Sequence, residues 1–189
     1  GIQIAFKDYK GALGIMGSRW VGLRHFKSFL GGHNFVTLMK NTFAISLYQL
    51  AVGFPIPIIL ALMLNEIRFP RYKKAVQTIL YAPHFISMVV MVGIIITMFS
   101  PSIGVINTIR ERLGLERVYY MAIPSAFRHL YVWSGVWQGM GWSAVIYISA
   151  LSAVDPELHE AARIDGASRL QRVLYINLPT IQPTITILF

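Results

Sequence analysis

The stretch from Thr42 to Leu64, TFAISLYQLAVGFPIPIILALML, contains no charged residue and is long enough to cross a membrane as a helix. The hydrocarbon core of a bilayer is about 30 Å thick, and about 20 apolar residues in a helix span it. Two more stretches meet the same criterion: 75–99, which contains His84 but no fixed charge, and 130–151, which carries three tryptophans. The sequence therefore predicts an all-α, polytopic membrane protein.

The overall composition supports this prediction. Of the 189 residues, 55% are hydrophobic and only 13% are charged, whereas about 25% of the residues of a soluble domain are charged. The chain has no cysteine, which excludes disulfides and thiolate metal sites, and we expect no metal site. We assign the net charge of +9 to Lys and Arg side chains near the faces of the bilayer, and we expect no binding to nucleic acid.

Basic residues between the predicted spans indicate which loops face the cytoplasm. The link 66–74 contains four Lys and Arg side chains, so we place it in the cytoplasm. The loop 100–129 then lies outside, and the segment 152–180 lies inside. The flank 1–41 also lies outside in this arrangement, although it carries six basic residues and one acid. Either its length or an earlier span must override that charge.

We predict one transmembrane domain over 1–189, with 1–41 as an extracytoplasmic flank. Within the flank, 20–30 forms either an amphipathic helix on the membrane face or a lead-in to the first span. A fourth apolar stretch, 181–189, covers about half a span. A chain cannot end there inside a bilayer, so we expect residues to be missing beyond this end, and at the other end as well.

Prolines and glycines predict the local shape of the spans. Pro55 and Pro57 in the first span and Pro83 in the second are expected to kink their helices. Gly135 and Gly139 in the third span have the spacing that lets two helices approach closely.

A polar segment follows the third span, and its pattern predicts two short helices joined by a turn. Asp155 is suited to cap the N-terminus of a first helix over 156–164. Ser168 and Gln171 match a capping box that opens a second short helix, which we expect to end by Pro179. The segment is too polar to span a membrane and too short to form a domain, so we expect it to dock on a partner.

The spacing of residues in this segment is specific. Glu160-Ala161-Ala162, three residues, Gly166, nine residues, Ile176, one residue and Leu178-Pro179 resemble the signature of the membrane subunits of binding-protein-dependent ABC importers. The run Ile164–Ala167 is also typical of the sugar-importing branch. An amphipathic linker with an accidental match is the alternative interpretation.

Three other runs extend the resemblance over nearly the whole chain. IAFKDYK from Ile4, WVGLRHF from Trp20 and NTF from Asn41 are similar to permeases for oligosaccharides and polysaccharides, such as those of alginate, aldouronate and lipo-oligosaccharide uptake. The resemblance implies the core of an ABC importer permease with a cytoplasmic coupling helix.

The resemblance also implies roles for residues in the coupling segment. Glu160 would form a charge-assisted hydrogen bond with a basic residue of an ATPase subunit. Ala161 and Ala162 would keep the docking face small, and Gly166 would permit the bend. Leu178-Pro179 would end the loop and aim the next helix into the bilayer. The implied ATPase-docking set is Glu160, Ala161, Ala162, Asp165, Gly166, Ile176, Leu178 and Pro179.

Further implications concern catalysis and partners. The chain contains no phosphate-binding loop of the Gly-xxxx-Gly-Lys-Ser/Thr type. The resemblance implies that it holds no cofactor and no catalytic residue, and that two cytoplasmic ATPase subunits bind ATP and Mg²⁺. The other implied partners are a second, related permease subunit that usually differs in this branch, an extracytoplasmic solute-binding protein, the carbohydrate and the lipid bilayer. The resemblance places the chain in the bacterial cytoplasmic (inner) membrane.

Polar and aromatic residues within the spans are candidates for the substrate path, because polar groups facing lipid are costly. Ordinary helix packing or an interfacial aromatic belt is the alternative for each, and we interpret His84 as a packed neutral side chain instead of a proton relay. The candidates are Tyr48, Gln49, Tyr81, His84, Trp133, Trp137 and Gln138.

Charge patterns separate the remaining possibilities. Basic residues of the outer flank (Lys7, Lys10, Arg19, Arg24 and Lys27) would steer an acidic polysaccharide. The alternative function is an ion-coupled secondary transporter, which needs intramembrane carboxylates or a broken-helix ion site. The three spans contain no Asp, Glu, Lys or Arg. A polytopic membrane enzyme is disfavoured because His84 has no catalytic companion.

Overall fold

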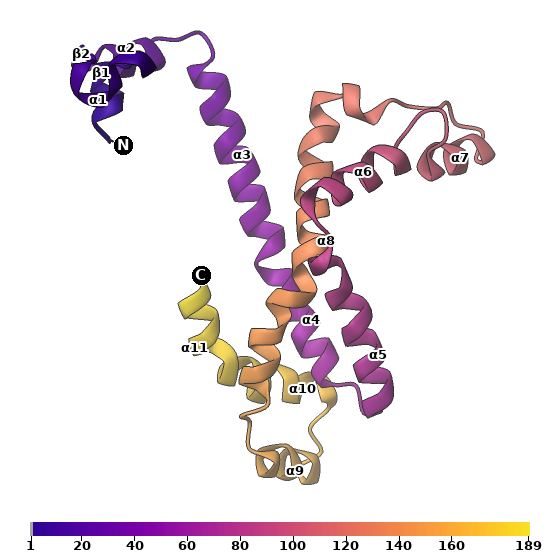
Figure 1. Ribbon diagram of the computed structural model, residues 1–189. Helices are drawn as coiled ribbons and strands as arrows, with labels where there is room; N and C mark the ends of the chain where they lie inside the picture. Colours follow the sequence, from indigo (N-terminus) through magenta and orange to yellow (C-terminus); the bar gives the residue numbers. More distant parts are fainter. Residues whose placement is uncertain (1) are drawn as a thin grey trace. The chain divides into compact units, whose positions relative to one another are not determined.

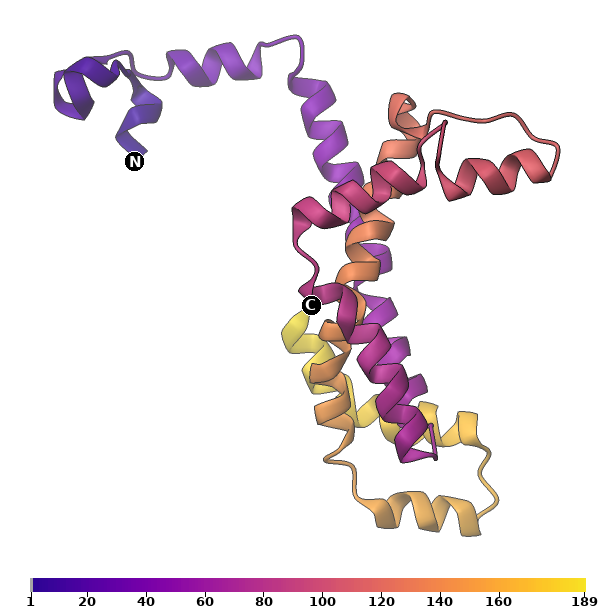
Figure 2. The same cartoon turned by 45° about the vertical axis from the view of Figure 1, so that its right-hand side comes forward.

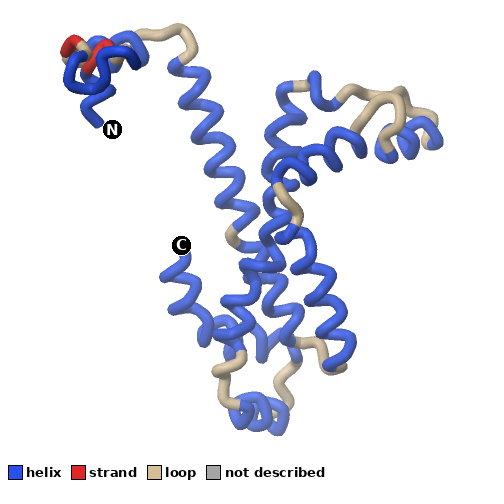
Figure 3. The backbone as a smooth tube through the Cα atoms, in the orientation of Figure 1, coloured by secondary structure: helices blue, strands red, loops and turns tan. Residues whose placement is uncertain are grey.

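The structure is a computed structural model in which residues 2–189 are described. The chain forms two compact units, Gly1–Ser46 and Leu47–Phe189. Helices dominate both units, and one short two-stranded sheet lies in the first (Figure 3).

The first unit is built around a small aromatic cluster. Strands β1 (Lys7–Asp8) and β2 (Arg19–Trp20) pair antiparallel, with Lys7 opposite Trp20. The ring of Phe6 stacks on Trp20 at 5.5 Å and tilts against Phe26 at 5.4 Å. The helices of this unit are η1 (Ile2–Phe6), η2 (Gly11–Leu13), α1 (Gly14–Gly17), α2 (Arg24–Leu30) and the start of α3 (Phe35–Gly53).

A helix, one of the two alternatives for 20–30, is present but covers only Arg24–Leu30. Trp20 belongs to β2, and Gly22 follows with a φ of +59°. Glycine adopts this left-handed conformation without a steric penalty, so the chain turns there before α2 begins at Arg24.

The second unit is a helical assembly around α8 (Pro124–Leu151), which packs on α4, α5 and α11 (Figures 1 and 2). Its other elements are α4 (Pro55–Asn65), α5 (Pro70–Tyr81), η3 (Ala82–Phe85), α6 (Met88–Met98), α7 (Val105–Arg112), η4 (Tyr120–Ala122), α9 (Pro156–Ile164), α10 (Arg169–Arg172), η5 (Val173–Asn177) and α11 (Leu178–Leu188).

Small residues allow the helices of this core to approach closely. Ala61 of α4 and Ala144 of α8 are both 0% exposed and belong to one buried cluster with Ile181 of α11. At Gly141 of α8, an added Cβ would overlap the carbonyl group of Leu80 in α5. The backbones of α5 and α8 therefore meet at a position where only glycine fits.

Within the described residues, no helix backbone approaches α8 closely at Gly135 or Gly139. A Cβ at Gly139 would meet no atom within 4 Å, and one at Gly135 would meet only the side chain of Gln49, at 3.8 Å. Glycine spacing alone does not say which face of a helix meets a neighbour, and here the neighbour lies over Gly141.

The first predicted span lies within a longer helical stretch. The 31 residues from Phe35 to Asn65 form a helix long and apolar enough to cross a membrane. The helical stretch thus begins at Phe35, seven residues before Thr42, and includes Lys40. A charge near a helix end can extend to the membrane surface, so the absence of charge does not mark where a helix begins.

The second predicted span is bent. Helix Pro70–Phe85 meets α6 at an angle of 101°, as a broken span or a re-entrant loop. Ile86 and Ser87 have extended backbones at the break, and the Ser87 hydroxyl accepts a hydrogen bond from the Val90 amide at 3.3 Å. Residues 75–99 are therefore not one straight helix. Ser87 caps the N-terminus of a new helix, so the break is not a kink within one continuous helix.

The third predicted span lies within α8, an unbroken helix of 28 residues. Among the described residues, one helix passes the length and composition test for a membrane span, or two if the bent pair is counted as one. α8 falls outside this group, although it is long enough to cross a membrane.

The expected end of the second short helix at Pro179 is also wrong. Helix α10 continues without interruption through the π-helical turn η5 into α11. The Leu178 amide donates to the Val173 carbonyl, five residues earlier. Proline lacks an N–H and crowds the carbonyl four residues before it. The wider π turn accommodates both effects, and the helix passes through Pro179.

Candidate functional site

The segment that carries the importer signature begins at a capped helix. The Asp155 carboxylate accepts a hydrogen bond from the Glu157 amide at 2.9 Å, and Pro156 occupies the first turn. Proline is suited to this position because its missing N–H would have no helical partner there. The predicted N-cap and the predicted bounds of this helix, α9, are both confirmed.

The C-terminus of α9 is capped as well. Gly166 has a φ of +79°, and the Ala167 amide donates to the Ala162 carbonyl at 2.8 Å. This is the Schellman arrangement, which requires a left-handed residue after the helix. The predicted capping box is present as well: Ser168 and Gln171 exchange hydrogen bonds of 2.7 and 3.3 Å. α9 is thus a short rigid helix between two defined turns.

No residue of α9 is buried within the chain. Two of its apolar side chains are exposed: Leu158 is 53% exposed and Ile164 is 86% exposed. Glu160 and Ala161 are exposed too. A helix of this kind gains little from packing on its own chain.

The second half of the signature has a different environment. Leu178 packs against the core cluster, and Ile181 in the following turn is 0% exposed. Arg172, 7% exposed, donates from Nη1 to the Ala167 carbonyl at 3.2 Å. The predicted docking residues thus form two groups. Glu160, Ala161, Ala162, Asp165 and Gly166 lie on or beside the projecting helix, whereas Ile176, Leu178 and Pro179 lie in the helix that anchors it.

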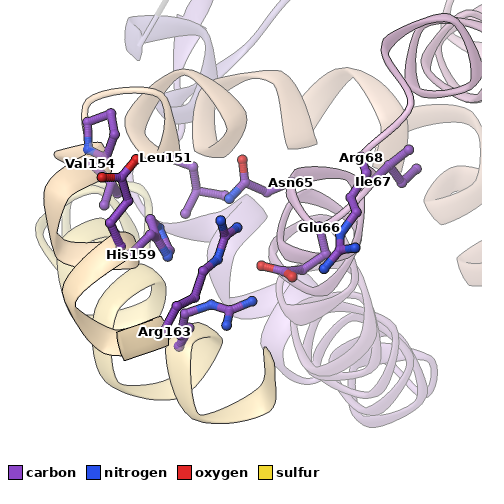
Figure 4. A pocket seen from close by; sticks show the side chains of 11 residues that line it. Asn65, Glu66, Ile67, Arg68, Leu151, Val154, His159 and Arg163 are labelled. Carbon is purple, nitrogen blue, oxygen red and sulfur yellow. The ribbon is translucent and has the colours of Figure 1, made fainter. Parts of the chain in front are cut away.

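A cleft of about 400 Å³ separates α9 from the link between α4 and α5. Figure 4 shows Glu66 entering it from the link and Arg163 from α9. Arg68, His159, Glu160 and Arg172 also line it. The link and the signature segment, which the charge pattern predicts on the same side of the membrane, lie at the same end of the helices.

Part of the predicted substrate path is a hydrogen-bonded aromatic group. The Tyr48 hydroxyl lies 3.0 Å from Nδ1 of His129 and accepts from Nε1 of Trp133 at 2.9 Å. The prediction missed His129. The sequence does contain a pointer to it, because His129 and Trp133 are four residues apart and so share one face of α8. Gln49, one residue after Tyr48, lies beside Gly135.

The other candidates gather at the bend between α5 and α6. Gln138 donates to the Ile86 carbonyl at 2.7 Å, which satisfies a backbone acceptor at the break. His84 stacks on Trp142 at 4.7 Å, and Tyr81 lies near Gly141. The structure thus separates the candidates into two groups, one at each region of contact along α8. Trp137, 43% exposed, is in neither.

Comparison with known proteins identifies the family. Residues 53–189 match the model of the binding-protein-dependent transport system inner membrane component. The chain belongs to this family. Over 188 residues it is 44% identical to the polygalacturonan/rhamnogalacturonan transport system permease protein YteP of Bacillus subtilis (strain 168), of which it covers 59%.

Solved structures support the same assignment. The chain superposes with a TM-score of 0.90 and 42% identity on a chain of a bacterial ABC transporter involved in the import of the acidic polysaccharide alginate. This match covers 100% of the chain and 62% of that structure's chain. A second match, with a TM-score of 0.85, 44% identity and coverage of 88% and 58%, comes from a bacterial alginate ABC transporter in complex with an alginate pentasaccharide-bound periplasmic protein. The fold is thus that of an ABC importer permease.

Proposed function

We propose that this chain is part of the transmembrane subunit of an ATP-driven, binding-protein-dependent importer for an oligosaccharide or polysaccharide. The observation that carries the proposal is α9. It is capped at both ends, unburied, and rooted by Arg172 and Ile181 in the helical core of a permease. Such a helix suits a surface that docks on another subunit, and the family to which the chain belongs supplies the transport context.

In this proposal α9 docks in a groove on a cytoplasmic ATPase subunit. Two such subunits bind ATP and Mg²⁺, and their closure displaces α9. The permease itself holds no cofactor and catalyses no reaction. Displacement passes to the core because α10, η5 and α11 form one continuous helix that packs on α8. A continuous helix transmits such a push along its hydrogen-bonded axis, and π turns within helices are frequent at functional sites.

The substrate class follows from relatives and charge together. The similar proteins are named for polygalacturonan, rhamnogalacturonan and alginate. The outer flank of this chain contains five basic residues before Gly31 and a single acid, Asp8. Positive charge at an entrance raises the local concentration of anionic ligands. We therefore propose an acidic polysaccharide, with Tyr48 and Trp133 offering aromatic faces to the sugar rings.

The remaining partners complete the complex. A second, related permease subunit pairs with this chain across the path, and an extracytoplasmic solute-binding protein delivers the sugar. The complex lies in the bacterial cytoplasmic membrane, which the chain crosses several times.

Co-purification tests the docking role. The full-length permease carrying Glu160→Lys is expected to lose most of its bound ATPase subunit, because a lysine would face the basic residue that Glu160 contacts. The matched control is Glu116→Lys, which makes the same charge change in the 100–129 loop. If both variants retain the ATPase as well as the unaltered permease does, α9 is not the docking helix.

Uptake competition tests the substrate class. Acidic oligosaccharides are expected to compete for transport at lower concentrations than neutral oligosaccharides of equal length. Equal competition by the two classes would exclude the proposed preference.

A further inference from the structure

The cleft beside α9 is lined by an acidic side chain, Glu66, and a basic one, Arg163, from two different elements. Glu66, the C-cap residue of α4, enters the cleft from one side, and Arg163, in the last turn of α9, enters from the other (Figure 4). Among residues 2–189, neither side chain is in an ion pair. These two opposite charges thus line one cleft, together with Arg68, Glu160 and Arg172.

Glu66 has basic neighbours on its own link as well as on α9, and one of them, Arg68, lines the same cleft. Glu66 is the only acid in the link 66–74, which also contains Arg68, Arg71, Lys73 and Lys74. Arg172 lines the same cleft, but it is 7% exposed and donates a hydrogen bond to the Ala167 carbonyl. Its side chain is therefore held in place, and it does not move with α9. Arg163 lies on the unburied helix and can approach the carboxylate.

The connections of α9 permit that approach. No residue of α9 is buried, so its displacement disrupts little packing. At one end the chain turns at Gly166, where an added Cβ would meet nothing within 4 Å. At the other end a short link joins Leu151 of the core to the Asp155 cap.

We propose that Glu66 and Arg163 form an ion pair when α9 is pressed toward the transmembrane helices, and that this pair passes the displacement directly to α4. The proposal rests on the proposed function, because an ATPase must drive α9. It adds a second route of coupling to the one through α10 and α11. Closing the cleft excludes water, and the attraction between the charges rises as the local dielectric constant falls.

A charge swap tests the pair in the complete transporter, reconstituted in vesicles with its ATPase subunits and binding protein. Glu66→Arg and Arg163→Glu are each expected to lower the sugar transported per ATP by at least about 2-fold, the lower limit for residues in direct contact. The double variant is expected to recover transport to within about 2-fold of the unaltered protein, because the pair is restored with its polarity reversed. The matched controls, Glu116→Arg and Arg112→Glu, lie in the 100–129 loop outside the cleft and are expected to leave coupling unchanged.

A cross-link reports the closure without reference to transport. These 189 residues contain no cysteine, and Ile67→Cys and His159→Cys place one thiol on each side of the cleft. A disulfide between them is expected with ATP bound, is lost when Glu66→Arg is added, and returns with the swap.

The outcomes separate this proposal from the proposed function. If the ATPase stays bound but the swap performs no better than the single variants, the Glu66–Arg163 pair is refuted and the docking role stands. If the disulfide forms equally well with Glu66→Arg, the pair does not drive closure. If the unaltered permease binds no ATPase, both proposals fall.

Discussion

Replacing Gly141 by alanine is expected to destabilise the permease, although alanine is the better helix former. A Cβ at position 141 would overlap the carbonyl oxygen of Leu80 and lie 2.6 Å from its carbonyl carbon. These are backbone atoms of α5, so no side-chain rotation relieves the clash and the two helices must separate. Overpacking of this kind costs about 1–3 kcal/mol.

Gly139, two residues earlier on the same helix, is the matched control. A Cβ there would meet no atom within 4 Å. Replacing a glycine inside a helix by alanine stabilises it by about 0.5–1 kcal/mol through backbone entropy. The two glycine-to-alanine changes are therefore expected to differ in sign.

Thermal unfolding of the purified full-length permease in detergent measures both variants. In a chain of this size, each kcal/mol of lost stability lowers the Tm by about 2–4 °C. A cost of about 1–3 kcal/mol for Gly141→Ala is therefore expected to lower the Tm by about 2–12 °C. Gly139→Ala is expected to leave the Tm unchanged or raise it slightly. Equal Tm values for the two variants would show that α5 and α8 do not meet at Gly141.

Three further predictions concern single polar groups. Asp155→Ala removes the cap on the Glu157 amide and is expected to destabilise α9 by about 1 kcal/mol. Amide hydrogen exchange over the helix should then be faster, and unchanged exchange would show that the cap contributes nothing. Asn107→Leu leaves the Val118 amide and three carbonyl groups without their partner in the 100–129 loop; we expect a loss of about 1–3 kcal/mol in thermal unfolding, and a Tm equal to that of the unaltered protein would contradict it. Asn177→Leu replaces a fully buried amide whose two polar atoms have no partner among the described residues; it is expected to raise the Tm, and a lower Tm would indicate that the amide is bonded in the intact complex.

The local structure of the coupling segment follows from sequence because its determinants are neighbours in the chain. The Asp155 carboxylate reaches the amide two residues later, and Ser168 and Gln171 are three residues apart. Gly166 adopts its left-handed conformation without help from residues distant in the sequence. Each interaction forms within one turn of helix, so pattern and structure agree.

Features that depend on neighbours distant in sequence were not predictable. The spacing of Gly135 and Gly139 matched a packing motif, but the helix that approaches α8 lies over Gly141. The partnership of Tyr48 with His129 joins residues 81 positions apart. No local pattern specifies which faces of two helices meet.

The sequence by itself determined that this is a helical membrane protein, that its signature segment carries a capped helix, and that the signature resembles that of ABC importer permeases. These conclusions rest on composition, on hydrogen bonds within a turn and on spacing along the chain. Only the tertiary structure decided that the second apolar stretch bends by 101°, that a π turn carries the helix through Pro179, and that Glu66 faces Arg163. Those outcomes depend on how helices pack and where backbone groups find partners, which is a property of the whole fold.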